Sequence, residues 1–175
     1  HTYFNLSGRP CPIGDHLIRI NADHYGAIDD TCAPTGEWNS VDDTVFDMRH
    51  ESRLADHLVI SENAAPEEKT QFSYGGGIDH PYLLNRKDSP DAELTCPDSG
   101  IRMSVTTTLP QFQVYLGSNL TKRTGKNGLV MKENYSVCLE PQFMPDGIHS
   151  ETEPDMILRA GENYEAETTF RFSVI

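Results

Sequence analysis

Short stretches in which apolar and polar residues alternate recur along the chain, and they constrain its fold more than any other feature. In residues 111–116, QFQVYL, the apolar side chains of Phe112, Val114 and Leu116 fall on one face of a strand, opposite a polar face. Turn-forming residues interrupt such stretches about every 8–12 positions, and helical periodicity is almost absent. The sequence therefore predicts an all-β protein, an antiparallel β-sandwich or barrel. Further strands are expected at residues 16–22, 92–96, 101–109 and 170–174.

Other segments are less regular. Residues 23–37 read as irregular structure with brief extended pieces, and the PTGE sequence at residues 34–37 reads as a turn. The best helical candidate is short, at residues 53–58. Residues 61–73, rich in Glu, Ala and Lys, are expected to form a solvated loop or a frayed helix.

Length and charge narrow the functional classes. The chain has 175 residues, enough for one domain, and 27 acidic against 14 basic residues give a net charge of -13. Such a charge repels nucleic acids and anionic membrane surfaces. No apolar run approaches the ~20 residues of a membrane helix. The sequence thus predicts a cytoplasmic protein without nucleic-acid or membrane partners. Since residue 1 is His and already lies in a strand-like pattern, we expect residues 1–175 to be one domain fragment of a longer protein.

The cysteines and histidines give no metal motif. The 4 cysteines are widely spaced without a CxxC pair, which indicates free thiols. None of the 7 histidines forms HxH, HxxxH or HExxH, so a metal site is not expected. Five of them stand in polar or loop-like surroundings and are expected to be solvated: His16, His24, His50, His57 and His149.

A single carboxylate stands in an otherwise uncharged strand-like run near residue 140. Alternation places Glu140 on the same face as Cys138 and Gln142, opposite Val137 and Leu139. A carboxylate on a rigid strand beside small polar neighbours is typical of a general base that lines a pocket. The alternative is an outward-facing Glu on a half-solvated strand.

Two further segments carry candidate polar groups. In HTYFNL, residues 1–6, alternation puts His1 on one face with Tyr3 and Asn5. Three glycines precede Asp79 and His80, and they allow a sharp turn or a close backbone approach. Adjacent residues of a strand point to opposite faces, so Asp79 and His80 would serve one site only across a bulge. The alternative is a turn Asp with a surface His.

An ordered set of short motifs resembles the aldose 1-epimerase (galactose mutarotase) family over essentially the whole chain. The motifs are HTYFNLSG at 1–8, ADxY at 22–25, PTGE at 34–37, TxFDxR at 44–49, GxDH at 77–80, QxYxG at 113–117, GKNG at 125–128, CLExQxxPD at 138–146 and LRxGExY at 158–164.

The resemblance implies a large antiparallel β-sandwich, of which this chain would be the C-terminal half. It implies that Glu140 is the general base and His1 the general acid, and that Asp79 and Gln113 bind the sugar. The expected partners are a monosaccharide and the N-terminal half of the same protein, possibly as a separate chain. Residues 1–175 alone are expected to be inactive and poorly soluble.

The implied activity interconverts the α and β anomers of a free hexose such as galactose or glucose. A base takes the proton of the C1 hydroxyl while an acid protonates the ring oxygen, and reclosure reverses the two roles. This chemistry needs no cofactor and no metal. Two alternatives within the resemblance are a hexose-phosphate 1-epimerase and a non-catalytic carbohydrate-binding sandwich.

Overall fold

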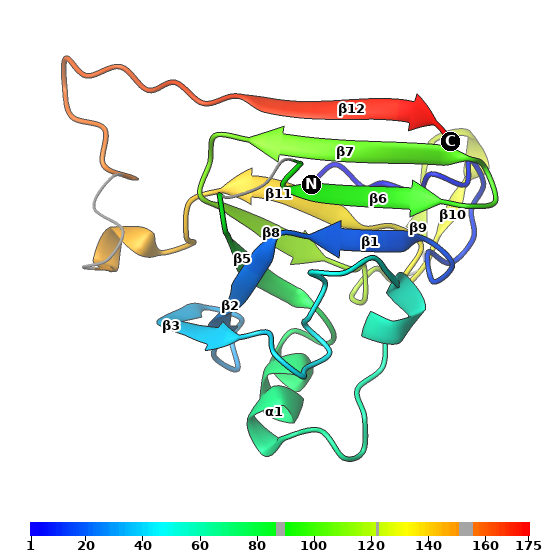
Figure 1. The fold of residues 1–175 in the computed structure, drawn as a ribbon, viewed down its shortest axis with the longest axis horizontal. Helices are drawn as coiled ribbons and strands as arrows, with labels where there is room; N and C mark the ends of the chain where they lie inside the picture. Colours follow the sequence, from blue (N-terminus) through cyan, green and yellow to red (C-terminus); the bar gives the residue numbers. More distant parts are fainter. Residues whose placement is uncertain (87–89, 122, 151–155) are drawn as a thin grey trace.

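Two antiparallel sheets of five strands each form the molecule (Figure 1). The computed structural model describes residues 1–86, 90–121, 123–150 and 156–175. In the first sheet the strand order is β12-β7-β6-β1-β4. Its strands are β1 (Leu17–Ile20), β4 (Ser52–Arg53), β6 (Ala92–Cys96), β7 (Ile101–Thr107) and β12 (Thr168–Val174).

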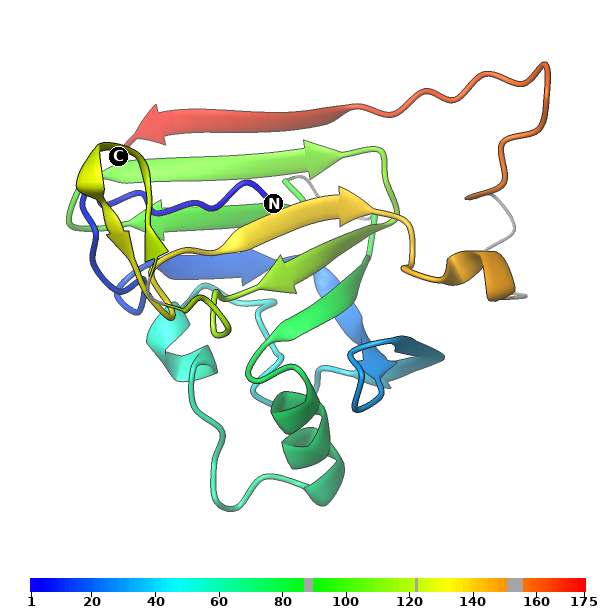
Figure 2. The ribbon, with the colours of Figure 1, turned by 180° about the vertical axis from the view of Figure 1, so that it is seen from behind.

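The second sheet has the order β11-β8-β5-β2-β3 and lies in front of the first in Figure 2. Its strands are β2 (Ala22–Ile28), β3 (Pro34–Ser40), β5 (Asp79–Leu84), β8 (Gln111–Tyr115) and β11 (Cys138–Gln142). A small hairpin, β9 (Arg123–Thr124) and β10 (Val130–Met131), encloses the 3-10 helix η2 (Lys126–Gly128), and η3 (Gly147–His149) follows β11.

The core fills the space between the facing sides of the two sheets. Leu94 and Val105 of the first sheet and Phe112 and Val114 of the second are all fully buried in it. These are the apolar positions of the alternating stretches, because a strand sends every second side chain to the same face. The predicted antiparallel β-sandwich is confirmed.

Two predictions about irregular segments were wrong. The PTGE sequence is the start of β3, which pairs with β2, and residues 23–28 belong to strand β2, although the pairing register of β2 shifts between Ala22 and His24 and between Gly26 and Ile28. Strand β3 is an edge strand with mostly exposed side chains, so backbone pairing forms it without an apolar pattern.

For residues 61–73 the helical alternative holds, because an α-helix, α1 (Pro66–Tyr74), is found there with Pro at its first turn. Buried polar side chains, and not an apolar stripe, anchor this helix. Gln71 accepts a hydrogen bond from the Ile28 amide and donates one to its carbonyl, and Glu68 accepts the Val45 amide. The predicted short helix at 53–58 is the 3-10 helix η1 (Leu54–His57).

Two histidines expected to be solvated are buried. His16 accepts the Leu6 amide hydrogen through Nε2 at 3.0 Å. His57 contacts the Ser52 hydroxyl and the Val45 carbonyl oxygen with its two ring nitrogens. The hydrogen bonds that each ring makes to backbone or hydroxyl groups of its neighbours offset part of the cost of burial.

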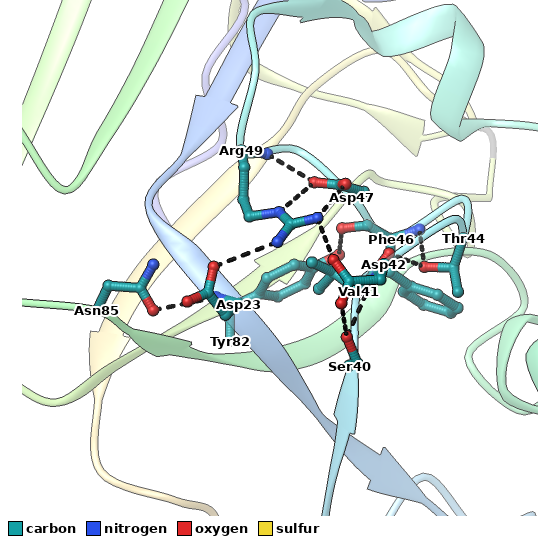
Figure 3. Close-up of polar contacts among 10 residues, drawn as sticks. All are labelled: Asp23, Ser40, Val41, Asp42, Thr44, Phe46, Asp47, Arg49, Tyr82 and Asn85. Atoms are coloured by element: carbon teal, nitrogen blue, oxygen red, sulfur yellow. Dashed lines mark hydrogen bonds and ion pairs between the residues drawn. The ribbon is translucent and has the colours of Figure 1, made fainter.

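Arg49 links the loop after β3 to strand β2 of the second sheet (Figure 3). Its guanidinium contacts Asp47 twice, at 2.9 and 2.6 Å, and reaches Asp42 at 2.5 Å and Asp23 of β2 at 3.4 Å. The Tyr82 hydroxyl of β5 donates to the Phe46 carbonyl of the same loop. These contacts fix β2 and β5, and β5 carries Asp79.

No helix in the described parts of the chain is both long and apolar enough to cross a membrane.

Candidate functional site

The outer face of the second sheet gathers the predicted polar residues, and strand register brings them together. Glu140 of β11 pairs with Gln113 of β8, and Gln113 also pairs with Pro81 of β5. Directly paired residues of neighbouring antiparallel strands send their side chains to the same face. We call the side of the second sheet that points away from the core its outer face. Glu140 and Gln113 are neighbours on this outer face.

A second row runs parallel to the first. Tyr115 of β8 pairs with Cys138 of β11 and with Asp79 of β5. Asp79 thus lies on the outer face, two residues from Pro81. His80, between them, points to the core. The alternation predicted for residues 111–116 is confirmed, since Phe112 and Val114 are fully buried.

The N-terminal segment extends this sheet beyond β11. Phe4 and Val137 form an antiparallel bridge, in which each amide donates to the other's carbonyl at 2.8 and 2.9 Å. Continuing that register places His1 beside Glu140. The His1 Nε2 and Glu140 Oε1 atoms are 3.6 Å apart.

Side-chain hydrogen bonds hold the N-terminal segment at this edge. The Asn5 amide nitrogen donates to the carbonyls of Tyr135 and Cys11, each at 2.8 Å. The Tyr3 ring stands at 5.9 Å from the His1 ring and meets the Tyr115 ring edge-on at 6.4 Å. The residues expected to share a face thus have two roles. His1 lies beside Glu140 in the site, and Asn5 anchors the segment.

A chain of hydrogen bonds orders the floor of the site. The Gln142 amide donates to the Gln113 side-chain oxygen at 3.3 Å, and the Gln113 amide donates to Asp79 Oδ1 at 2.7 Å. Each bond fixes the rotamer of the next group, so Gln113 presents its nitrogen to Asp79. Gln142 was not among the sequence-predicted site residues, although its position two residues after Glu140 is the signal that reveals it.

Burial tunes the two carboxylates of the site. Burial raises the pKa of Glu140, and the negative charge of Asp79 adds to the rise. Burial also raises the pKa of Asp79, while the hydrogen bond from Gln113 opposes it. Among the described residues, Glu140 Oε1 is buried without a hydrogen-bond partner. A carboxylate with a raised pKa and a free lone pair is a stronger proton acceptor than an exposed one.

Cys138 lies beneath the site and is fully buried. Burial raises its pKa to about 12, and the charge of Glu140 acts in the same direction. A thiol with such a pKa stays protonated near neutrality and is a poor nucleophile. Cys138 therefore packs the floor of the site, and the 4 cysteines are all free, as expected.

The glycines before Asp79 make a tight turn between α1 and β5. Gly76 and Gly77 have φ of 61° and 125°, a region that favours glycine. A Cβ on Gly75 would stand 2.5 Å from the Gly77 carbonyl oxygen and 2.9 Å from His80 Cε1. The turn sets where β5 begins and so positions Asp79.

His80 contradicts the alternative of a surface histidine, because it is fully buried. Its ring meets Tyr25 and Phe46 edge-on, at 5.6 and 4.9 Å, and its Nδ1 accepts the Asp79 amide hydrogen at 3.1 Å. Burial lowers the pKa of His80 to about 4. The neutral ring is therefore a core residue that also satisfies the backbone of Asp79.

The surface hollows add little chemistry. A hollow of about 350 Å³ lies between residues 43–45 and the segment before α1, and no acid–base pair of the site borders it. A smaller hollow of about 100 Å³ is lined by Tyr3 and Ser136, beside the site. Within the described ranges, no three His, Cys, Asp or Glu side chains are grouped to hold a metal ion.

Fold and site together define a class, the antiparallel β-sandwiches with a polar site of carboxylate, imidazole and amide groups on the outer face of one sheet. The family model for aldose 1-epimerase matches residues 1–171. The human protein called galactose mutarotase is 37% identical over 178 residues, and the Escherichia coli aldose 1-epimerase is 30% identical over 177 residues. These alignments cover 99% and 98% of this chain. The chain belongs to the aldose 1-epimerase family.

The structural comparison agrees with the sequence comparison. The solved GalM/aldose epimerase homologue from C. elegans superposes with a TM-score of 0.81 at 31% identity, over 99% of this chain and 50% of that one. The chain covers 48% of the human protein and 49% of the E. coli protein. It spans about half the length of the relatives that it matches.

Proposed function

We propose that the protein to which this chain belongs is an aldose 1-epimerase that interconverts the anomers of a free hexose, galactose or glucose. The observation that carries the proposal is the His1–Glu140 pair, with 3.6 Å between Nε2 and Oε1, on a face shared with Asp79 and Gln113. An imidazole and a carboxylate side by side provide an acid and a base at one point.

The reaction needs such a pair because its two proton transfers occur at the two oxygen atoms bonded to C1, the hydroxyl oxygen and the ring oxygen. Glu140 takes the hydroxyl proton as the C1–oxygen bond to the ring breaks, and protonated His1 gives its proton to the ring oxygen. The open sugar is an aldehyde. Rotation about the C1–C2 bond presents the other face of the carbonyl, and reclosure returns both protons.

The remaining site residues bind and orient the sugar in this proposal. Asp79 and Gln113 offer oxygen and amide groups to sugar hydroxyls from the strands next to Glu140. Burial of Glu140 supports its role as base, because a raised pKa increases basicity while an ordinary carboxylate titrates well below neutrality. Acid–base groups of this kind each contribute roughly 10²–10⁴-fold to the rate.

We further propose that the other half of the family fold is the main partner of this chain, on the same polypeptide or as a separate chain. The edge strand β12 supports this, since Phe172 and Val174 are 54% and 85% exposed there. The cytoplasm is the compartment we propose, supported by 4 free cysteines.

Polarimetry of freshly dissolved α-galactose and α-glucose tests the function. The complete protein should accelerate the change in optical rotation of at least one sugar well above the spontaneous rate. A rate equal to the spontaneous one for both sugars would refute the proposal and leave the non-catalytic binding alternative. Acceleration only for a hexose phosphate would instead support the phosphate-specific alternative.

A further inference from the structure

Three polar side chains form an oblique row across β11, β8 and β5. Gln142 Nε2 donates to Gln113 Oε1 at 3.3 Å, and Gln113 Nε2 donates to Asp79 Oδ1 at 2.7 Å. In the register of the sheet, Gln113 pairs directly with Glu140 of β11 and with Pro81 of β5. Gln142 and Asp79 each lie two residues from these partners, so they are diagonal neighbours of Gln113 within reach of its side chain. The row therefore passes beside Glu140.

The chemistry of the groups fixes the direction of both hydrogen bonds. An ionised carboxylate only accepts hydrogen bonds, so Asp79 requires the nitrogen of the Gln113 amide to face it. The Gln113 oxygen then faces Gln142, and Gln142 must present its own nitrogen. The bond from Gln113 lowers the pKa of Asp79 against the effect of burial, which favours the ionised form. Each amide in the row thus has a single orientation that satisfies its neighbours.

The backbone of β11 holds Gln142 in a fixed relation to Glu140. Pro141 stands between them, and its ring fixes its own φ angle. Pro141 pairs with Phe112, which is fully buried, so this part of the strand is anchored to the core. Glu140 and half-buried Gln142 lie on the same face, about 7 Å apart along the strand. Gln142 is therefore placed to hold Gln113 from the strand that also carries Glu140.

We propose that Gln142 is a positioning residue, which holds the Gln113 amide in the orientation that binds Asp79 and leaves the second hydrogen of the Gln113 nitrogen for a sugar hydroxyl. The proposal rests on the function proposed above. A glutamine side chain has three rotatable bonds, and ordering it before the sugar arrives lowers the entropy cost of binding. Because this benefit applies equally to the bound sugar and to the transition state, it should affect KM and leave kcat nearly unchanged.

Steady-state kinetics of the complete protein and its variants on galactose and glucose, followed by polarimetry, test the proposal. Gln142→Ala removes the donor and should raise KM about threefold to tenfold, the value of one hydrogen bond, with kcat changed by less than about twofold. Gln142→Glu nearly keeps the size of the side chain, but the new carboxylate cannot donate to the Gln113 oxygen.

The order of the two variants distinguishes positioning from packing. In Gln142→Glu the Gln113 oxygen faces a carboxylate, or the amide turns over and its oxygen faces Asp79. Either arrangement sets two acceptors against each other, so Gln142→Glu should raise KM more than Gln142→Ala. A side chain that only filled space would give the reverse order, because the glutamate nearly conserves volume and the alanine does not. That reverse order would overturn the proposal.

A double-variant cycle tests whether Gln142 acts through Gln113. Gln113→Ala should itself raise KM, because it removes a sugar-binding group. In that background, Gln142→Ala should change KM no further, since the side chain that it positions is absent. If the two effects on KM multiply instead, Gln142 acts on the sugar independently of Gln113, and the proposal is wrong.

A matched control accounts for the added charge of Gln142→Glu. Asn163→Asp makes the same change from amide to carboxylate at an exposed position outside the row, and it should keep the parent KM. Circular dichroism verifies folding of every variant. Should Gln142→Ala fail to fold, Gln142→Met keeps the length of the side chain without a donor and is expected to raise KM by a similar factor.

The outcomes separate this inference from the function itself. An active parent whose KM is unchanged in folded Gln142→Ala and Gln142→Glu contradicts the positioning role and leaves the proposed function in place. A loss of kcat at unchanged KM contradicts it as well. A parent inactive on every free sugar overturns the proposed function and this inference with it.

Discussion

Acid should destabilise this protein through His80, and the structure allows the effect to be worked out. His80 is fully buried between the Tyr25 and Phe46 rings, and burial lowers its pKa to about 4. An unfolded histidine titrates near ~6.5. As the pH falls through that value, His80 of the unfolded chain binds a proton, whereas His80 of the folded protein stays neutral. Stability that is present above about pH 6.5 is therefore lost progressively toward pH 4.

The size of this loss follows from the difference between the two pKa values. Between pH 7 and pH 5 His80 alone should lower the free energy of unfolding by about 2 kcal/mol, and below pH 4 by about 3 kcal/mol in all. His16, whose pKa is also lowered by burial, acts in the same direction. The raised pKa values of Asp79 and Glu140 act in the opposite direction.

A variant isolates the contribution of His80 from these others. His80→Asn places an amide oxygen where Nδ1 accepts the Asp79 amide hydrogen, and it does not titrate. Urea unfolding followed by circular dichroism at pH 7 and pH 5 gives the loss in each protein. The loss should be about 2 kcal/mol smaller in the variant than in the parent. Equal losses in the two proteins would refute the account of a buried, neutral His80.

Two other predictions concern the floor of the site. Asp79→Asn should raise KM for the sugar about tenfold and change kcat less, because Asp79 is assigned to sugar binding and loses a charge-assisted hydrogen bond; steady-state kinetics showing a loss in kcat alone would contradict that role. Cys138, buried and with a pKa of about 12, should resist iodoacetamide at pH 8 while the exposed Cys32 is alkylated. Mass spectrometry of tryptic peptides decides, and rapid labelling of folded Cys138 would show that the floor is open.

Alternation in the sequence predicts the strands that bury one face, and the reason is physical. Phe112 and Val114 fill the core from one side of β8, so the pattern of that strand is visible without the structure. The edge strand β3 has little to bury, so its sequence shows no apolar alternation, and PTGE resembles a turn. Helix α1 likewise has no apolar stripe that would indicate it in the sequence, since its anchors are the polar side chains of Glu68 and Gln71.

The sequence likewise predicts only part of the candidate site. Alternation puts Glu140 and Gln113 on polar faces, but it does not show that the two strands are neighbours. The approach of His1 to Glu140 depends on the bridge between Phe4 and Val137, which local patterns cannot reveal. Only the ordered motifs of the family indicate that these segments meet.

The central claim is that Glu140 is the base of an acid–base pair with His1, and anomer exchange measures it most directly. The exchange rate between α- and β-galactose, followed by magnetisation transfer between the anomeric protons, is compared for the complete protein and its Glu140→Gln variant. Glutamine keeps the size of the side chain but cannot accept the proton, so the variant should lose about 10²–10⁴-fold in rate. A folded Glu140→Gln protein that exchanges the anomers as fast as the parent would contradict the account.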